Sequence, residues 1–344
     1  QKCSAASLAI VEASVYDDPT FGIRLRDAVQ SLRVAEPFDL SSMVGPIIGA
    51  PNPALHRALT TLDTGESWLV EPACLDIDRH LWAPAVRMGV QPGSWFHRTE
   101  CFGPVLGVIR ADDLDQAIEI QNSSNFGLTG GIHSLDPSEI ATWLDRVEIG
   151  NAYVNRMITG AIVQRQPFGG WKQSSVGGGP KAGGPGYVQQ FARIATGTSS
   201  VDAAASYADA WASQFAAEHD PSGLSAESNV LRYFSVDRVL VRHDGNDPVA
   251  IDLLRLAAAT TGVVLDESST VDEPDSEFLA RLGGVNRIRL LTDLSDDARR
   301  RCHEANVALD ESAPVSDGFV ELYRWVREQS ISRTMHRHGR LTAR

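Results

Sequence analysis

Hydrophobic and polar residues follow two different periods along the first third of the chain. Residues 8–15 carry the apolar run of a strand, and from Asp18 the apolar positions change to the spacing of an amphipathic helix. The same criteria predict strands at 86–90, 105–109, 128–133 and 150–155, and a helix that begins at Asp113. The pattern indicates strands that alternate with helices.

The start of one helix is predicted clearly by residues 136–139. Asp136, Pro137 and Glu139 stand in the order of an N-cap, a first-turn proline and a capping glutamate. An apolar stripe follows at residues 140–147, so a helix is expected there. Residues 168–186 are so rich in glycine that we expect a loop.

The last third of the chain repeats the alternation of strands and helices. Residues 199–228 are rich in Ala, Ser and Asp and are expected to form a linker. Beyond it we expect strands at 236–241, 262–265 and 287–291, with helices at 247–261, 276–282 and 294–305. This order predicts an α/β, doubly wound domain. No G-x-G-x-x-G follows its first strand, so its Rossmann-like form does not imply dinucleotide binding.

Composition narrows the functional classes. The chain has 344 residues, of which 43% are hydrophobic and 22% charged, and no apolar run approaches a membrane span. A formal charge of -13 would repel phosphate backbones, so nucleic acid is not expected as a partner. The basic tail at 333–344 is either a solvated terminus or an anion-binding segment.

The four cysteines are far apart in the sequence and form no C-x-x-C pair. Neither a metal site nor a disulfide framework is therefore expected, and a reducing cytoplasm suits the chain best. Taken alone, Cys3 is best explained as a small buried hydrophobic residue.

Its neighbours change that interpretation. Four segments resemble aldehyde dehydrogenases in family order: Q-K-C-S at residues 1–4, E-C-F-G-P-V at 100–105, Asn122 with F-G-L at 126–128, and P-F-G-G at 167–170. The resemblance implies that Cys3 is the nucleophile that attacks the aldehyde, and that NAD is the cofactor. A thiolate suits this step because it gives a thiohemiacetal that can be oxidised to a thioester. By the same resemblance, Glu100 binds the nicotinamide ribose and Phe102 lies beside the ring; plain core packing is the alternative for Phe102.

A longer match concerns the substrate. Residues 150–156 and 159–170 resemble L-glutamate gamma-semialdehyde dehydrogenase, also called 1-pyrroline-5-carboxylate dehydrogenase. In that subfamily, backbone N–H groups of an anchor loop hold the α-carboxylate of the substrate, which here implies Gly160 and Ala161, helped by Ser4. Phe168 would flank the aliphatic chain of the substrate. Simple packing could also explain Phe168, and a turn could explain Gly160.

The remainder resembles the C-terminal extension of some proline utilization A proteins, where it has no catalytic role. This likeness rests on residues 227–233, 321–322 and 327–334. We therefore expect a catalytic part at 1–198, the linker at 199–228 and the extension at 229–344. In the family, the nucleotide-binding domain and the general base precede the nucleophile, so we expect this chain to be the C-terminal portion of a longer enzyme and inactive alone.

The resemblance also implies a homo-oligomer, and FAD only if a proline dehydrogenase domain lies upstream. Two other functions stay open. The chain could be a non-catalytic structural or assembly module that keeps the fold, or part of a dehydrogenase for another short carboxylated aldehyde such as succinic semialdehyde.

Overall fold

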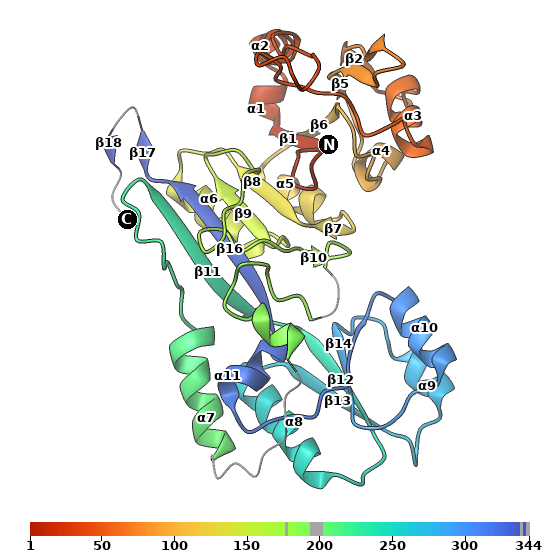
Figure 1. Cartoon of the computed structure of the whole chain (residues 1–344), viewed down its shortest axis with the longest axis vertical. Helices are drawn as coiled ribbons and strands as arrows, with labels where there is room; N and C mark the ends of the chain where they lie inside the picture. Colours follow the sequence, from red (N-terminus) through yellow and green to blue (C-terminus); the bar gives the residue numbers. More distant parts are fainter. Residues whose placement is uncertain (176–177, 193–201, 338–339, 342–344) are drawn as a thin grey trace. The chain divides into compact units, whose positions relative to one another are not determined.

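The computed structural model describes residues 1–175, 178–192, 202–337 and 340–341. Contacts between residues divide the chain into two compact units. The first unit comprises Gln1–Asn125 and Ser134–Glu148, and the second comprises Phe126–His133 and Ile149–Arg344. Figure 1 labels their helices and strands.

A four-stranded sheet forms the centre of the first unit. Its order is β1 (Leu8–Glu12), β6 (Val105–Ala111), β5 (Ala85–Met88) and β2 (Ser67–Val70). The first three strands are parallel, and β2 is antiparallel to β5. The other elements of this unit are α1 (Ala13–Tyr16), α2 (Pro19–Gln30), α3 (Pro53–Thr60), α4 (Trp95–Arg98), α5 (Leu114–Asn122), α6 (Pro137–Arg146), and the hairpin strands β3 (Ala73–Asp76) and β4 (Leu81–Ala83).

At the start of α6, the N-cap predicted at Asp136 is confirmed, but the predicted capping bond of Glu139 is not formed. The Asp136 carboxylate accepts a hydrogen bond from Ser138 N–H at 2.7 Å, as expected of an N-cap. The Glu139 carboxylate does not reach back to Asp136 N–H, because Ser134 stands between them. The Ser134 hydroxyl donates to Glu139, and Asp136 N–H donates to Ser134 Oγ at 3.0 Å.

A second four-stranded sheet joins distant parts of the sequence. Its order is β11 (Glu227–Ser235), β16 (Val326–Thr334), β9 (Asn151–Val154) and β8 (Thr129–Ile132). Strand β16 runs antiparallel to β11 and parallel to β9, with Ser330 opposite Asn151. The glycine-rich segment, expected to be loop throughout, contains a short strand β10 (Trp171–Lys172) that pairs with β7 (Phe126–Gly127).

The doubly wound domain is confirmed. Strands β13 (Val264–Ser269), β12 (Arg238–His243), β14 (Arg287–Leu290) and β15 (Ala308–Asp310) lie in that order and are all parallel. Helix α8 (Pro248–Thr261) packs on the face that carries Val239 and Val241. Helices α9 (Asp275–Ala280) and α10 (Asp296–Glu304) pack on the opposite face, against Leu240. The crossovers thus cover both faces, as expected for a parallel sheet.

Part of the expected linker is folded into the core. It carries α7 (Ala203–Ala210) and the π-helix η2 (Trp211–Phe215), and the side chain of Tyr207 is fully buried. Residues 199–201 lie outside the described residues. The remaining short elements are η1 (Val188–Phe191), α11 (Gly318–Glu321), η3 (Leu322–Trp325), β17 (His336–Arg337) and β18 (Arg340–Leu341). Of the basic tail, residues 338–339 and 342–344 are also outside the described part.

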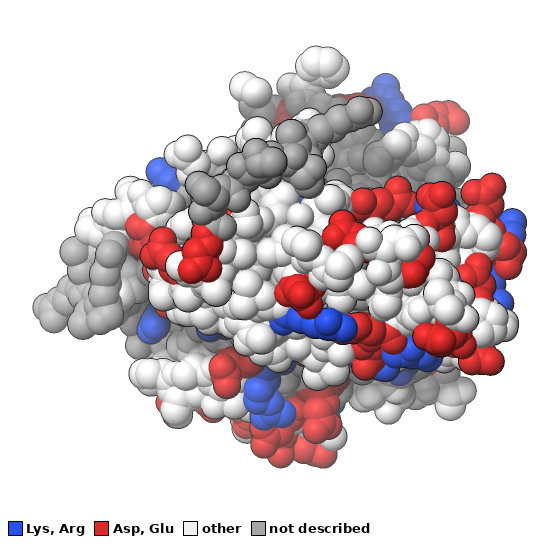
Figure 2. Space-filling view, turned by 90° about the horizontal axis from the view of Figure 1, so that it is seen from below, with Lys and Arg blue, Asp and Glu red and all other residues white. Residues whose placement is uncertain are grey.

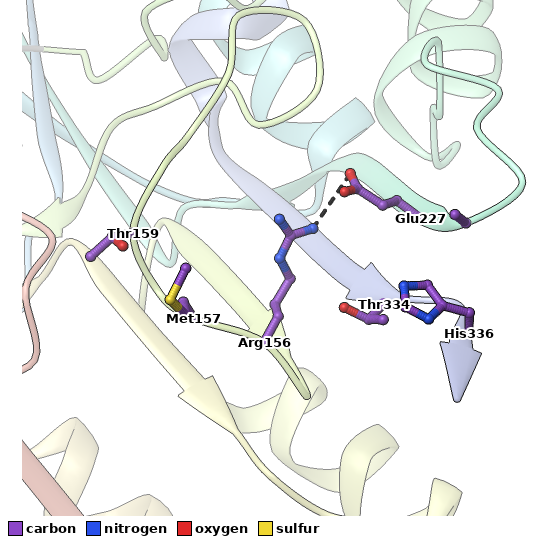
Figure 3. Close-up of a pocket in the computed structure, with 7 residues that line it drawn as sticks. Arg156, Met157, Thr159, Glu227, Thr334 and His336 are labelled. Atoms are coloured by element: carbon purple, nitrogen blue, oxygen red, sulfur yellow. Dashed lines mark ion pairs between the residues drawn. The ribbon is translucent and has the colours of Figure 1, made fainter. Parts of the chain in front are cut away.

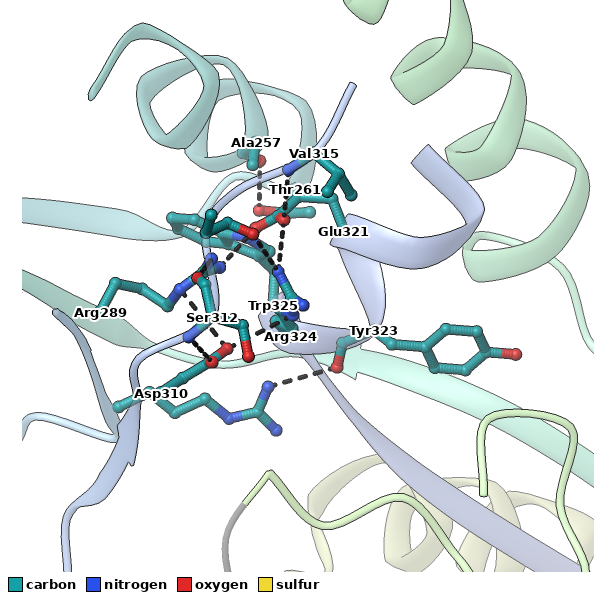
Figure 4. A network of polar contacts seen from close by, with 12 residues as sticks. Ala257, Thr261, Arg289, Asp310, Ser312, Val315, Glu321, Tyr323, Arg324 and Trp325 are labelled. Carbon is teal, nitrogen blue, oxygen red and sulfur yellow. Dashed lines mark hydrogen bonds and ion pairs between the residues drawn. The ribbon is translucent and has the colours of Figure 1, made fainter. Parts of the chain in front are cut away.

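A buried polar network connects the doubly wound sheet to the segment that leads into β16 (Figure 4). The Arg289 guanidinium on β14 donates to the Glu321 carboxylate, and both side chains are almost fully buried. The same carboxylate accepts hydrogen bonds from Trp325 Nε1 at 3.0 Å and from Val315 N–H at 3.2 Å. Because each of these groups would be costly to bury alone, the network fixes where β16 begins.

No helix within the described residues is long and apolar enough to cross a membrane. Acidic side chains prevail over basic ones on the face shown in Figure 2, which fits the charge of -13.

Candidate active site

Cys3 lies in a tight turn that exposes it. Ala5 N–H donates to Lys2 O at 3.0 Å, which closes a turn with Cys3 and Ser4 at its two central positions. The Cys3 thiol is free and its residue exposed, whereas Ser4 is only 7% exposed. The turn therefore presents a thiol to an incoming electrophile and directs the next residue inward.

The side chain of Gln1 ties this turn to two other segments. Gln1 Nε2 donates to Phe102 O at 2.7 Å, and Gln1 Oε1 accepts from Ile48 N–H at 2.6 Å. A primary amide supplies one donor and one acceptor at the same end, which suits such a bridge. Gln1 thus holds the turn that carries Cys3 against the segment that carries Phe102.

Strand pairing brings the same two segments together independently. Strands β1 and β6 are parallel, with Leu8 opposite Gly107. Cys3 precedes Leu8 by five residues and Phe102 precedes Gly107 by five residues. Both therefore lie at the amino end of neighbouring strands, on one edge of the sheet.

Glu100 and Phe102 form an exposed segment with a strained backbone. Glu100 is exposed, and Phe102 retains 36% of its accessible surface. Phe102 has φ 53°, a left-handed conformation that costs a non-glycine residue about 1–3 kcal/mol. An exposed ring in a strained conformation is poorly explained as core packing, so this segment fits a ligand-facing role.

The other cysteines are poorer nucleophiles or lie elsewhere. Cys101 is buried, and burial raises the pKa of its thiol to about 11. Burial also raises the pKa of the Cys302 thiol. Cys74 is exposed, but it lies on β3, away from the motifs. Because the thiolate is the reactive form, Cys3 is the best placed nucleophile of the four.

In the second unit, the anchor segment (residues 159–170) presents unused backbone donors. Gly160 has φ 86°, which glycine adopts readily, and Gly160 and Ala161 are both exposed. No described residue accepts a hydrogen bond from either N–H group. Two adjacent free donors without bulky side chains can bind a carboxylate.

A buried glutamine supports the anchor segment from beneath. Gln166 Oε1 accepts from Ile162 N–H at 2.9 Å, while Gln166 Nε2 donates to Asn229 Oδ1 at 2.6 Å and to Ser332 Oγ at 3.1 Å. Asn229 and Ser332 belong to β11 and β16. The extension thus holds one end of the anchor segment.

Phe168 is held at the other end of the segment. Its N–H donates to Ala182 O at 2.9 Å, and Ala182 N–H donates to Phe168 O at 3.0 Å. The preceding carbonyl, Pro167 O, accepts from Ser330 Oγ at 2.6 Å and from Asn151 Nδ2 at 3.0 Å. Phe168 is half-buried, so part of its ring remains available to a ligand.

A cavity of about 310 Å³ is bordered by Thr159, the residue that precedes Gly160 in the sequence (Figure 3). It is lined by Arg156, Met157, Thr159, Ala226, Glu227, Thr334 and His336. Arg156 Nη1 lies 3.5 Å from the Glu227 carboxylate and donates to Ser332 Oγ at 2.6 Å. Since Glu227 offsets the charge of Arg156, the cavity is not a strong anion site.

The candidate residues fall into two groups. Cys3, Ser4, Glu100 and Phe102 lie in the first unit, and Gly160, Ala161 and Phe168 lie in the second. The supporting roles of Gln1 and Gln166 were not predicted from the sequence. Both residues lie inside the recognised motifs, but their hydrogen-bond partners are far away in the sequence and no local pattern indicates them. No group of three His, Cys, Asp or Glu within the described part of the chain could hold a metal.

Known proteins match this chain in two ways. The model of the aldehyde dehydrogenase family matches residues 1–196. The 1-pyrroline-5-carboxylate dehydrogenase of Geobacillus sp. (strain WCH70) is 36% identical over 191 residues, which are 55% of this chain and 36% of that protein. The chain therefore spans about a third of the length of this curated relative.

Solved structures extend the match beyond residue 196. Proline utilization A from Corynebacterium freiburgense has a TM-score of 0.86 and 44% identity, over 99% of this chain and 36% of that one. Proline utilization A from Bdellovibrio bacteriovorus has a TM-score of 0.50 and 38% identity, over 56% of this chain and 20% of that one. The first match includes the doubly wound domain, which confirms the resemblance of the extension. Because the family model covers more than half of its residues, the chain belongs to the aldehyde dehydrogenase family.

Proposed function

We propose that this chain is the part of an NAD-dependent dehydrogenase that carries the nucleophile and the substrate anchor, and that the enzyme oxidises L-glutamate gamma-semialdehyde to L-glutamate in the cytoplasm. The observation that carries the choice of substrate is the pair of free N–H groups at Gly160 and Ala161. The motif around them resembles the anchor loop of 1-pyrroline-5-carboxylate dehydrogenases, and the relative from Geobacillus bears that name.

Cys3 begins the reaction. Its exposed thiol, once deprotonated, attacks the carbonyl carbon of the aldehyde and gives a tetrahedral thiohemiacetal. Loss of hydride from that carbon leaves a thioester on Cys3, and attack by water releases the carboxylic acid and the thiol. Gln1 keeps the turn of Cys3 in place during both steps through its bonds to Phe102 and Ile48.

Glu100 and Phe102 are the residues that would hold the nicotinamide cofactor. An exposed carboxylate can accept hydrogen bonds from ribose hydroxyls, and the accessible Phe102 ring can pack beside a flat heterocycle. The strained backbone of Phe102 supports a functional reason for its conformation. When bound, NAD supplies the hydride acceptor.

The anchor determines which aldehyde binds productively. An α-carboxylate would accept hydrogen bonds from the backbone N–H groups of Gly160 and Ala161. An aldehyde without that carboxylate forgoes both hydrogen bonds to a charged group, at roughly 1.5–3 kcal/mol for each.

The test compares two aldehydes on a complete enzyme that carries this sequence. We expect kcat/KM for glutamate semialdehyde to exceed that for butanal by about two to four powers of ten, since about 1.4 kcal/mol corresponds to a factor of ten. Equal values for the two aldehydes would contradict the proposal. Higher activity on succinic semialdehyde than on glutamate semialdehyde would show that a different carboxylated aldehyde is the substrate.

A further inference from the structure

A buried lysine and glutamate meet beneath the turn that carries Phe168. Lys181 lies within the glycine-rich segment and is 1% exposed, and Glu328 lies on β16 and is 3% exposed. Lys181 N–H donates to Glu328 Oε2 at 2.5 Å. The two residues are 147 positions apart, so this contact joins the family's catalytic part to the extension.

The ammonium group of Lys181 binds the turn directly. Lys181 Nζ donates to Gly169 O and, at 2.8 Å, to Asn151 Oδ1. Asn151 Oδ1 also accepts from Gly169 N–H at 3.2 Å. Both polar atoms of the Gly169 backbone are therefore fixed by one lysine and one asparagine.

The carbonyl of Glu328 fixes the far side of the same turn. Trp171 Nε1 donates to Glu328 O at 2.8 Å. The backbone carbonyl of Glu328 thus accepts a hydrogen bond from Trp171, the residue after the turn, and its side chain accepts one from Lys181 N–H. The extension also reaches the glycine-rich loop through Arg287 Nη2, which donates to Gly178 O at 2.6 Å.

Stability alone does not account for two ionisable side chains buried at this place. Burying a lysine and a glutamate costs at least as much desolvation as their attraction returns, and an apolar pair of similar volume is commonly as stable or more so. An apolar pair, however, could neither donate to Gly169 O nor accept from Lys181 N–H. What the charged pair adds is therefore the position of the turn.

We propose that Lys181 and Glu328 are positioning residues that set the geometry of the Pro167–Gly170 turn, and with it the place of Phe168 beside the substrate. The proposal rests on the proposed role of the anchor segment. It assigns to the extension a direct part in substrate binding: a strand residue of the extension orders the loop that contacts the aldehyde.

The electrostatic surroundings agree with this geometry. Burial lowers the pKa of Lys181 and raises the pKa of Glu328, and each charge opposes the shift of the other. The other ionisable groups that face Glu328 are Arg287, Tyr233 and Tyr323. Among these groups, Lys181 is the one that donates a hydrogen bond to the turn, at Gly169 O. A change in the protection of the turn's amides therefore reports on Lys181 and Glu328.

The experiment separates positioning from stability by means of the double variant Lys181→Met/Glu328→Leu. The quantity measured on the 344-residue chain is amide hydrogen exchange at Phe168 and Ala182. The N–H group of each of these residues donates to the carbonyl oxygen of the other. We expect exchange at both amides to rise about tenfold or more, as local opening becomes easier, while the global free energy of unfolding stays close to that of the unsubstituted chain.

Two further variants serve as controls. Glu66→Gln alters the buried ion pair with Arg87 in the first unit, and should leave both amides as protected as before. Glu328→Gln keeps an acceptor for Lys181 N–H and should give an intermediate rise in exchange; it also provides the test if the double variant does not fold. Unchanged protection of Phe168 and Ala182 in the variants of Glu328 would overturn the proposal.

A kinetic measurement on the complete enzyme links the turn to the substrate. In the double variant, KM for glutamate semialdehyde should rise about tenfold with kcat little changed, because a displaced Phe168 packs less well on the aliphatic chain of the aldehyde. If the unsubstituted enzyme does not oxidise glutamate semialdehyde, the proposed function fails but the exchange result still decides the positioning role. A fall in kcat with KM unchanged would assign the pair to general folding.

Discussion

The side-chain amide of Gln1 donates a hydrogen bond to the backbone carbonyl of Phe102 at 2.7 Å. This bond fixes the turn of Cys3, the proposed nucleophile, to Phe102, which we expect beside the nicotinamide. The bridge is exposed, and it joins segments about 100 residues apart. Its value lies in relative position, because a thiohemiacetal can lose hydride only to an acceptor at the correct distance and angle.

Replacing Gln1 should therefore damage catalysis more than folding. In a complete enzyme, Gln1→Ala should lower kcat/KM by roughly ten- to a hundredfold, while the free energy of unfolding falls by about 1 kcal/mol, the usual loss for an exposed hydrogen bond. Steady-state kinetics and urea unfolding measure the two effects. The matched control is Lys2→Ala at the neighbouring exposed residue, which should change neither quantity. A parallel loss of stability and activity would mean that Gln1 is merely structural.

Cys3 and Cys74 provide a pair of exposed thiols for testing the nucleophile. Cys3→Ala should abolish aldehyde oxidation and leave NAD affinity within about twofold, because the thiol takes part in chemistry and not in cofactor binding. Cys74→Ala should keep full activity. Turnover rates and NAD titration by fluorescence provide the readouts. Retained turnover in Cys3→Ala would remove Cys3 from the mechanism.

The anchor can be blocked at Ala161. Ala161→Leu should reduce kcat/KM for glutamate semialdehyde by about a hundredfold or more, since the larger side chain keeps the carboxylate from the backbone donors. The effect on butanal should be much smaller. Ala161→Gly keeps both donors without added bulk and serves as the control, with near-normal discrimination. Losses of equal size for the two aldehydes would leave the segment with a structural role only.

Phe102 offers a test of strain against function. At φ 53°, glycine is relieved of the penalty that alanine retains, so Phe102→Gly should be more stable than Phe102→Ala by about 1 kcal/mol. Both variants lose the ring, and both should bind NAD more weakly than the unsubstituted enzyme. Unfolding by urea and NAD titration distinguish the two effects. NAD affinity that is unchanged in both variants would show that the ring does not contact the cofactor.

The Lys181–Glu328 pair predicts an unusual dependence of stability on pH. Burial raises the pKa of Glu328 from 4.5 to about 7, so its protonated form favours folding at low pH and this contribution is lost as pH rises through about 7. Burial lowers the pKa of Lys181 from 10.5 to about 7, so its neutral form favours folding at high pH and this contribution is lost as pH falls through about 7. The pair should therefore stabilise least near neutrality.

The measurement is the free energy of unfolding of the unsubstituted chain minus that of Lys181→Met/Glu328→Leu, taken at about pH 5, 7 and 9. The difference should be smallest at the middle value. Subtraction removes the other titrating groups, which both proteins share. A difference that is greatest at neutral pH would mean that attraction between the charges outweighs their burial.

Sequence reasoning recovered the elements whose hydrophobic pattern is local. Helix α8 carries its cap at Asp247 and a glycine in the left-handed region directly after its end, and both marks are readable in the sequence. The doubly wound order was recovered for the same reason, since each strand and its crossover helix are neighbours in the chain. The motif around Cys3 likewise lies within a few residues.

The strands β11 and β16 were missed because polar residues occupy buried positions in both, and most of the buried positions in β16. Strand β16 buries Glu328, Gln329, Ser330 and Ser332, so it shows no alternation of apolar and polar positions. Strand β11 does alternate, but one of its buried positions is Asn229. Such residues are satisfied only by partners far away in the sequence, which no local period reveals. The supports of the anchor segment were missed for this reason.

The parallel pairing of β16 with β9 also dictates an order of events during synthesis. Ser330 pairs with Asn151, so about 180 residues must be added before β9 meets this neighbour. At the usual rate of about 5–20 residues per second, the ribosome needs roughly 10–35 s for that stretch. During this interval the nascent β9 presents an unpaired edge to other chains. A chaperone that binds extended segments would protect the anchor until the last strand arrives, and a slower ribosome would lengthen the period of risk.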